Sequence, residues 1–307
     1  MKRRKAGRFS VRNDEALATS ARAAGLWADV TLADALTEAA STEPQRVLLV
    51  DGDVRLTTTK LLNQAQSLAG AMQARMEPGS TVSFMLPNWH EAAVIYLAAT
   101  LAGMVANPVL PSLREHDLRF ILPDAGTRMI FVPQEFRGFE CAAMVRSVVA
   151  DMDDGPEVIV VRGDGSGGSS FDSLLQEGMN FGPCPLDPDD VRMIMYTSGT
   201  TGRPKGVMHT HNTIHALIMQ LKQHWLIESG DTFLVPSPIS HIGGSIYAFE
   251  APLLLQTTAV LMERWDAAEA IPLMLDEGVT HMAGATPFLQ HLLAAARRAQ
   301  TDLPDLK

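Results

Sequence analysis

Residues 196–207 bring together, in one short stretch, the groups that bind a polyphosphate. The stretch reads Tyr-Thr-Ser-Gly-Thr-Thr-Gly-Arg-Pro-Lys-Gly-Val and follows a mostly apolar run, Val191 to Met195. Hydroxyl groups, loop N–H groups and a lysine ammonium bind phosphate oxygens, and glycines allow the backbone to approach a ligand. The stretch predicts a phosphate-binding loop after a buried strand. A hydroxyl-rich turn without a ligand is the alternative.

The spacing of this loop excludes the Walker-type P-loop. That motif requires Gly-x-x-x-x-Gly-Lys-Ser/Thr, whereas the residue five positions after Gly199 is Pro204 and the residue five after Gly202 is Val207. Pro204 also lacks an N–H and has a fixed φ, so Lys205 is not placed to open a phosphate-binding helix.

Residues 233–245 form a second stretch whose residues could take part in a reaction. They read Phe-Leu-Val-Pro-Ser-Pro-Ile-Ser-His-Ile-Gly-Gly-Ser, which is an apolar strand followed by prolines, a histidine and paired glycines. A single histidine is more often structural than functional. Gly243 and Gly244 suit either a tight strand-to-helix turn or the passage of an acyl group beside the backbone.

Taken together, these residues resemble the adenylate-forming superfamily of AMP-binding enzymes, which includes acyl-CoA synthetases, aryl-CoA ligases, luciferases and peptide-synthetase adenylation domains. Its signature, Tyr-Thr-Ser-Gly-Thr-Thr-Gly-x-Pro-Lys-Gly, is matched throughout by residues 196–206. The resemblance implies that Lys205 neutralises the β- and γ-phosphates of ATP as a catalytic residue. It also implies that the loop wraps these phosphates through Thr197, Ser198, Gly199, Thr200, Thr201 and Gly202.

The resemblance also assigns a role to the second stretch. In the superfamily the matching strand leads into Pro-x-x-x-His, and the histidine stands at the mouth of the carboxylate pocket. His241 is therefore the second expected catalytic residue. Leu-Pro-Asn-Trp at 86–89 and Asn-Pro-Val-Leu-Pro at 107–111 resemble a branch that acts on cyclohexanecarboxylate and other fatty or alicyclic acids. The expected pocket residues are Ile239, His241, Ile242, Gly243, Gly244 and Ser245.

The chemistry that the resemblance implies has two steps. A small-molecule carboxylic acid attacks the α-phosphate of ATP, with Mg²⁺ between phosphate oxygens, and gives an acyl-adenylate and pyrophosphate. The thiol of coenzyme A then displaces AMP. In such transfers the protein mainly positions the reactants and neutralises charge.

Several later motifs of the superfamily are not found in the 307 residues. These are Tyr-Gly-x-Thr-Glu, Thr-Gly-Asp and the small C-terminal domain, and Tyr247 to Glu250 only superficially echoes the first. The expectation is the N-terminal portion of an acyl-CoA synthetase, a truncated form with impaired turnover. The alternative is a non-catalytic nucleotide- or acyl-binding half-domain that needs a second chain. Uncovered apolar faces are expected to favour self-association.

Composition agrees with a packed α/β protein in the cytoplasm. Residues 1–12 hold six basic groups and no acids; because the net charge of −10 includes them, the remainder carries −16. This acidic body argues against nucleic acid as a partner, and the basic start is expected to be a solvated terminus. No apolar run is long enough to span a bilayer, and the longest, Ala92 to Ala106, is expected to be a core helix. Buried free thiols are expected at Cys141 and Cys184.

The four histidines around residues 209–224 do not have the spacing of a metal site. His211 and His215 lack the intervening glutamate of a zinc-protease helix, and a third ligand at a recognised spacing is not found. Ordinary polar-face positions are expected for the group, and the sequence predicts no metal site. Its members are His209, His211, His215 and His224.

Alternating strands and helices predict an α/β fold with stacked, mainly parallel sheets and flanking helices. Asp51-Gly52 suits a type I′ turn, so residues 46–57 are expected to form a hairpin. Helical spacing appears at 31–40, capped by Thr31, at 60–76, and at 210–226, capped by Thr210 or Asn212. Further strands are expected at 82–86, 105–109, 129–132 and 158–161. The expected divisions are a basic tail (1–30), a first α/β subdomain (31–185) and an incomplete second one (186–307).

Overall fold

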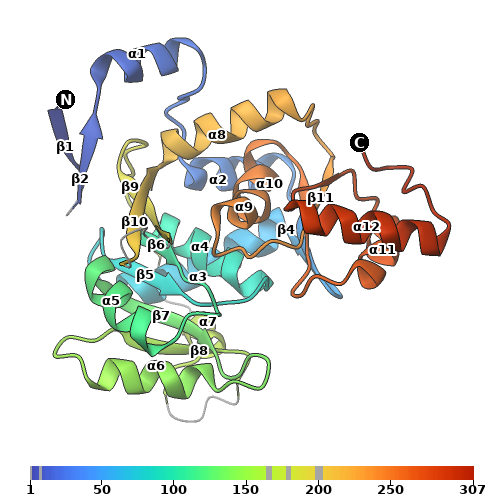
Figure 1. Ribbon diagram of the computed structural model, residues 1–307. Helices are drawn as coiled ribbons and strands as arrows, with labels where there is room; N and C mark the ends of the chain where they lie inside the picture. Colours follow the sequence, from blue (N-terminus) through green and yellow to red (C-terminus); the bar gives the residue numbers. More distant parts are fainter. Residues whose placement is uncertain (1, 7–8, 164–167, 178–180, 198–202) are drawn as a thin grey trace.

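Two stacked, mostly parallel β-sheets form the framework of the molecule (Figure 1). The computed structural model describes residues 2–6, 9–163, 168–177, 181–197 and 203–307. Its strands are β1 (Lys2–Ala6), β2 (Phe9–Asn13), β3 (Val47–Asp51), β4 (Val54–Thr57), β5 (Thr81–Phe84), β6 (Val105–Pro108), β7 (Thr127–Pro133), β8 (Glu157–Val161), β9 (Val191–Thr197), β10 (Lys205–Thr210), β11 (Thr232–Val235), β12 (Thr258–Leu261) and β13 (His281–Met282).

The six-stranded sheet has the order β10-β9-β6-β5-β7-β8, and the five-stranded sheet has the order β13-β11-β12-β3-β4. Each sheet is parallel except for one edge strand, β10 in the first and β4 in the second. The predicted fold class is confirmed. Strands from both sides of residue 185 enter each sheet, and the division into subdomains at that residue stays a prediction.

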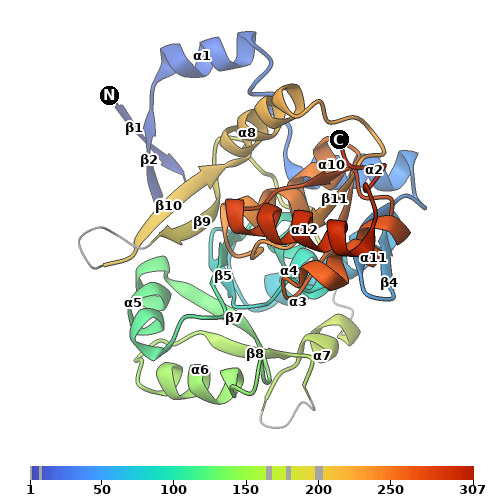
Figure 2. The same ribbon diagram turned by 45° about the vertical axis from the view of Figure 1, so that its right-hand side comes forward.

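Helices lie between the two sheets and on their outer faces (Figures 1 and 2). They are α1 (Glu15–Ala23), α2 (Leu32–Thr42), α3 (Thr58–Gln73), α4 (His90–Leu101), α5 (Glu115–Ala125), α6 (Cys141–Ala150), α7 (Phe171–Gln176), α8 (His211–His224), α9 (Ile242–Ser245), the π-helix η1 (Ile246–Glu250), α10 (Ala251–Leu254), α11 (Ala267–Asp276) and α12 (Thr286–Ala299).

Alternation along the strands explains this layering, because successive side chains of a strand point to opposite faces. Phe84 and Phe233, on different sheets, belong to one central core that also contains α3 and α4. Their neighbours face outward: Met85 packs against α5 and α6, and Leu234 packs against α11 and α12. Eleven of the twelve residues of α4 are buried, so this helix lies between the two sheets.

Local signals produce several elements as expected. Thr31 caps α2 through a capping box with Asp34, and Thr210 caps α8 by accepting the Thr213 N–H. Gly52 has φ +55° in the turn between β3 and β4, a conformation that glycine adopts without strain. The two caps and the hairpin are confirmed. The type I′ turn at Asp51-Gly52 is wrong: Asp51 pairs with Val54, so Gly52 and Asp53 form the turn, and of these two only Gly52 has the positive φ that a type I′ turn needs at both.

Three expectations from the sequence are wrong in detail. The apolar helix ends at Leu101, because Gly103 turns the chain at φ +72° and residue 105 already begins β6. Phe9 and Val11 pack against Val105, so this part of the basic segment is not a frayed terminus. The Cys184 thiol is half-buried, whereas Cys141 is buried as expected. Among the described residues, every helix is too short or too polar to cross a lipid bilayer.

Candidate functional site

The two ends of the predicted phosphate loop lie side by side on the β9–β10 hairpin. Thr197, the last residue of β9, pairs in antiparallel register with Lys205, the first residue of β10, and both side chains are exposed. The glycine that follows has a packing reason: a Cβ at Gly206 would lie 3.0 Å from Ile194 Cγ2 and 3.3 Å from the Tyr196 ring. The hairpin thus brings Thr197 and Lys205 together at the two ends of the predicted loop.

The interior of the predicted loop lies outside the described residues. The positions concerned are Ser198, Gly199, Thr200, Thr201 and Gly202. Their phosphate-binding role stays a prediction. The hairpin places only the two ends of the loop, Thr197 and Lys205.

The second predicted stretch follows β11 at the carboxyl end of the five-stranded sheet. His241 is exposed and caps α9, with its Nδ1 accepting a hydrogen bond from the Gly243 N–H at 3.1 Å. A Cβ at Gly244 would lie 2.2 Å from the Pro238 carbonyl oxygen, so the tight turn itself requires glycine there. A Cβ at Gly243 would meet only the His241 ring within 4 Å, so packing does not require glycine there, and its role in the acyl pocket stays a prediction.

The residues before and after the exposed His241 in this stretch are buried or half-buried. Ile239 and Ser245 are fully buried, and Ile242 is half-buried. The Oγ atoms of Ser240 and Ser245 are buried without a hydrogen-bond partner within the described part of the chain. Unpaired buried hydroxyls are unusual in folded proteins.

A buried ionic network connects the two predicted stretches. Arg192, on β9, donates from Nη1 to the Tyr96 hydroxyl at 2.6 Å and from Nη2 to Glu250 Oε1 at 2.5 Å. The Tyr96 hydroxyl also donates to Glu250, the last residue of η1. Arg192 is 5% exposed and Glu250 1% exposed. The strand that leads to Lys205 is thereby tied to the helix that follows His241.

The charges in this network shift the pKa of its members. Burial, together with Glu250, raises the pKa of the Tyr96 hydroxyl well above its ordinary value, although Arg192 opposes the shift. Burial would lower the pKa of Arg192, but the neighbouring Glu250 and Tyr96 raise it overall. The network therefore holds a charged guanidinium and a protonated phenol.

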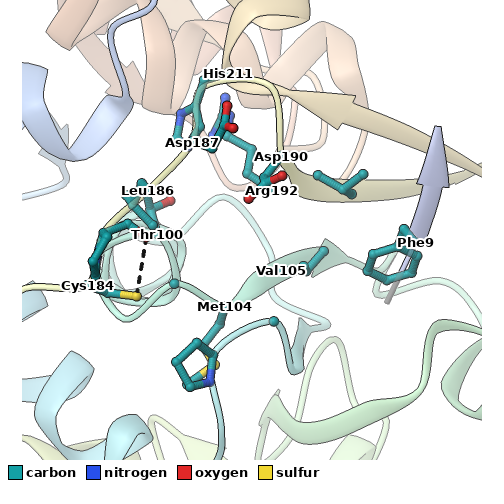
Figure 3. A pocket seen from close by; sticks show the side chains of 15 residues that line it. Phe9, Thr100, Met104, Val105, Cys184, Leu186, Asp187, Asp190, Arg192 and His211 are labelled. Atoms are coloured by element: carbon teal, nitrogen blue, oxygen red, sulfur yellow. Dashed lines mark hydrogen bonds between the residues drawn. The ribbon is translucent and has the colours of Figure 1, made fainter. Parts of the chain in front are cut away.

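A cavity of about 200 Å³ lies beside the buried guanidinium, away from the predicted site residues (Figure 3). It is lined by Arg192, His211, Thr100 and Cys184, among others. His211 accepts the Leu32 N–H through Nδ1 at 3.1 Å, and burial, followed by the charge of Arg192, lowers its pKa well below 6.5. The expectation of a polar-face position is therefore wrong for His211, which is a neutral, buried contact of α2.

Asp51, His90 and Glu91 are the group of described residues that is close enough to hold a metal ion. A guanidinium already fills the position between them: Arg162 Nη2 lies 2.6 Å from Asp51 Oδ2, 3.2 Å from His90 Nδ1 and 2.9 Å from Glu91 Oε2. The arrangement is an ion-pair cluster that includes none of the predicted site residues.

The fold defines an α/β protein with two stacked sheets, and residues 36–307 match the family model described as AMP-binding enzyme. The chain belongs to this family, the adenylate-forming acyl-CoA ligases. It is 30% identical over 295 residues to the medium-chain fatty-acid–CoA ligase of Escherichia coli (strain K12), covering 93% of this chain and 51% of the relative. The chain spans about half the length of the curated relatives it matches.

Solved structures show the same fold. The inhibitor-bound N-terminal domain of FACL13 from Mycobacterium tuberculosis is 25% identical with a TM-score of 0.78, covering 90% of this chain and 68% of that one. The o-succinylbenzoate coenzyme A synthetase MenE from Bacillus subtilis, in complex with AMP, is 24% identical with a TM-score of 0.72, covering 85% and 63%. The family resemblance and the fold inferred from the sequence are confirmed.

Sequence reasoning missed three buried polar residues that organise this region. Arg192 and Glu250 are paired only through the fold, and the sequence around Glu250 suggests nothing more than a helix. Asn88 lies in the Leu-Pro-Asn-Trp motif, which supports the family resemblance without indicating a role. The signal that finds all three is burial of a polar side chain with specific partners.

Proposed function

We propose that this chain provides the ATP- and acid-binding part of an acid–thiol ligase, which converts a carboxylic acid to an acyl-adenylate and then to an acyl-CoA thioester. One observation carries the proposal: the signature residues Thr197 and Lys205 are paired and exposed at the two ends of the predicted loop, in a chain of the acyl-CoA ligase family. The signature supplies hydroxyls, amides and one cation, a composition that suits a polyphosphate.

In this proposal the loop from Thr197 to Gly202 binds the β- and γ-phosphates, and Lys205 neutralises the charge that develops on the departing pyrophosphate. Mg²⁺ enters with ATP as part of the substrate, bound through phosphate oxygens. Coenzyme A is the second substrate. The coenzyme A ligase among the relatives supports the assignment of coenzyme A.

For the acid we propose a fatty or alicyclic carboxylate. His241 would stand at the entrance, with the apolar side chains of Ile239 and Ile242 next to it. A pocket of this kind suits an apolar acyl group, because its burial releases water from both surfaces. The medium-chain fatty-acid–CoA ligase among the relatives supports this choice.

A second candidate function is a binding subunit that keeps the nucleotide and acyl sites and acts with another chain. Pyrophosphate release distinguishes the two functions, because a ligase produces it and a binding subunit does not.

Titration of the purified chain with ATP·Mg²⁺ tests both candidates. We expect a saturable heat signal with a dissociation constant in the millimolar range or tighter, as is typical for enzyme substrates. Addition of octanoate should then release pyrophosphate if the chain is a complete ligase. The absence of heat at millimolar ATP would contradict both functions.

Exposed leucines on α12 support the proposed self-association. Leu289 and Leu293 are one helical turn apart and are 46% and 60% exposed, and Leu289 lines a hollow together with Trp225 and Leu306. Figure 2 shows α12 on the outer side of the five-stranded sheet. Exposed apolar surface of this kind favours association.

We therefore expect the chain to associate as its concentration rises, and the double substitution Leu289→Lys, Leu293→Lys to reduce this association. Light scattering on a size-exclusion column measures it. Leu17→Lys is the control, since Leu17 is 65% exposed on the distant α1. A wild-type chain that is monomeric at every concentration would contradict the expectation.

A further inference from the structure

The turn between β5 and α4 lies across the carboxyl edge of the five-stranded sheet. Strands β3, β11 and β12 are parallel, so their carboxyl ends share one edge. Asn88 contacts the ends of two of these strands, through Val235 on β11 and Met262 just after β12. In parallel sheets this edge is where ligands commonly bind.

Asn88 uses both ends of its amide and is 3% exposed. Its Nδ2, with two N–H groups, lies within hydrogen-bond distance of three carbonyl oxygens, those of Val235 at 3.0 Å, Ser237 at 2.9 Å and Met262 at 3.1 Å, so one N–H is shared between two of them. Its Oδ1 accepts the Ile239 N–H at 3.0 Å. A carboxylate or an apolar side chain of similar size cannot both donate and accept at these positions.

Three of the four contacts fall on alternate residues of one segment, at 235, 237 and 239. This segment leads directly to His241, whose own N–H donates to the Pro238 carbonyl at 3.0 Å. The same carbonyl packs against Gly244 on α9. The position of His241 therefore follows from the path that Asn88 imposes on residues 235–239.

Neighbouring residues hold the turn in place. The Trp89 Nε1–H donates to Glu263 Oε2 at 2.6 Å, just beyond the Met262 contact. The His90 N–H donates to Asp51 Oδ2 at 3.1 Å, at the end of β3. The turn is thus held at the end of β3 and at Glu263, after β12, so Asn88 is anchored independently of the segment that it binds.

We propose that Asn88 is a positioning residue, which fixes residues 235–241 and so presents Ile239 and His241 to the carboxylic acid. The inference rests on the proposed function for the acid pocket, but the conformational part concerns this chain alone. Asn88 acts through the segment and does not contact the acid.

Hydrogen exchange of the Ile239 amide tests the conformational part. In Asn88→Ala we expect this amide to exchange at least about tenfold faster, because its buried acceptor is lost. Asn88→Ser is the milder variant, since its hydroxyl keeps one possible contact, and it covers the case in which Asn88→Ala does not fold.

Asn107→Ala is the matched control. Asn107 is also a buried asparagine, but its Nδ2 donates to Ser83 Oγ, within the six-stranded sheet. We expect its replacement to leave exchange at Ile239 unchanged. Equal exchange at Ile239 in wild type and both Asn88 variants overturns the proposal.

Calorimetric titration with octanoate and, separately, with ATP·Mg²⁺ tests the functional part. We expect Asn88→Ser to weaken octanoate binding about tenfold while ATP·Mg²⁺ binding stays at the wild-type level, a split that general destabilisation does not produce. Equal losses for both ligands overturn the positioning role. Failure of the wild-type chain to bind either ligand instead shows that the proposed function is wrong, and the exchange measurement still decides what Asn88 does to the segment.

Discussion

Lys205→Ala is expected to slow adenylation about a hundredfold, measured as ATP–pyrophosphate exchange in the presence of octanoate. Removing one charged contact to the developing negative charge commonly costs about 3 kcal/mol of transition-state stabilisation, which corresponds to this factor. Lys205 begins β10 opposite Thr197, and its side chain is exposed. The substitution should therefore leave the unfolding midpoint of the protein unchanged.

Lys60→Ala is the control for this substitution. Lys60 is also an exposed lysine, but it lies on α3, outside the predicted site. We expect exchange at the wild-type rate in this variant. If the chain does not catalyse exchange, titration with ATP·Mg²⁺ makes the same comparison of the two lysines. Lys205→Ala with unchanged exchange and unchanged ATP binding would refute the proposed role of Lys205.

The sequence predicts those parts of the fold that depend on neighbouring residues. The β3–β4 hairpin follows from Gly52 in its turn, and the start of α2 follows from Thr31 and Asp34, because turns and caps are set by local backbone chemistry. The signature at 196–206 identifies the family without any structure, since its spacing is specific. These local signals account for the fold class and for the two candidate stretches.

Pairing between distant strands is not encoded in local periodicity. The antiparallel β3–β4 pair is early in the chain, yet β3 pairs with β12, some two hundred positions later. The sequence misplaces the end of α4 for a related reason. The helix lies between two sheets and is apolar on every side, so it has no polar face. Without an apolar–polar periodicity, the sequence pattern does not mark the residue at which the helix ends.

Buried polar residues are the third feature that the sequence does not reveal. His211 resembles its neighbours at 209 and 215 in sequence, but the fold buries it, with its Nδ1 bonded to the Leu32 N–H. Arg192 stands in a mostly apolar strand, and its partner Glu250 comes from the π-helix η1, far away in the sequence. Such pairs depend on tertiary structure, and their contribution is measurable.

Glu250→Leu is expected to destabilise the fold by about 3–5 kcal/mol, because it leaves the Arg192 charge buried without its carboxylate. Urea unfolding followed by fluorescence measures the change. Asp154→Ala is the control: Asp154 and Arg128 form an ion pair in which both side chains are largely exposed, so its loss should change the free energy of unfolding by less than about 1 kcal/mol.

Adding Arg192→Met and Tyr96→Phe to Glu250→Leu should recover most of the lost stability, since apolar side chains of similar volume often replace a buried ion pair without net cost. A triple variant as unstable as Glu250→Leu alone would contradict this expectation. Recovery would show that the buried charges do not increase the free energy of unfolding. Because Arg192 lies on the strand that ends at Thr197 and Glu250 ends the helical segment that begins after His241, the remaining role is to fix the two candidate stretches relative to each other.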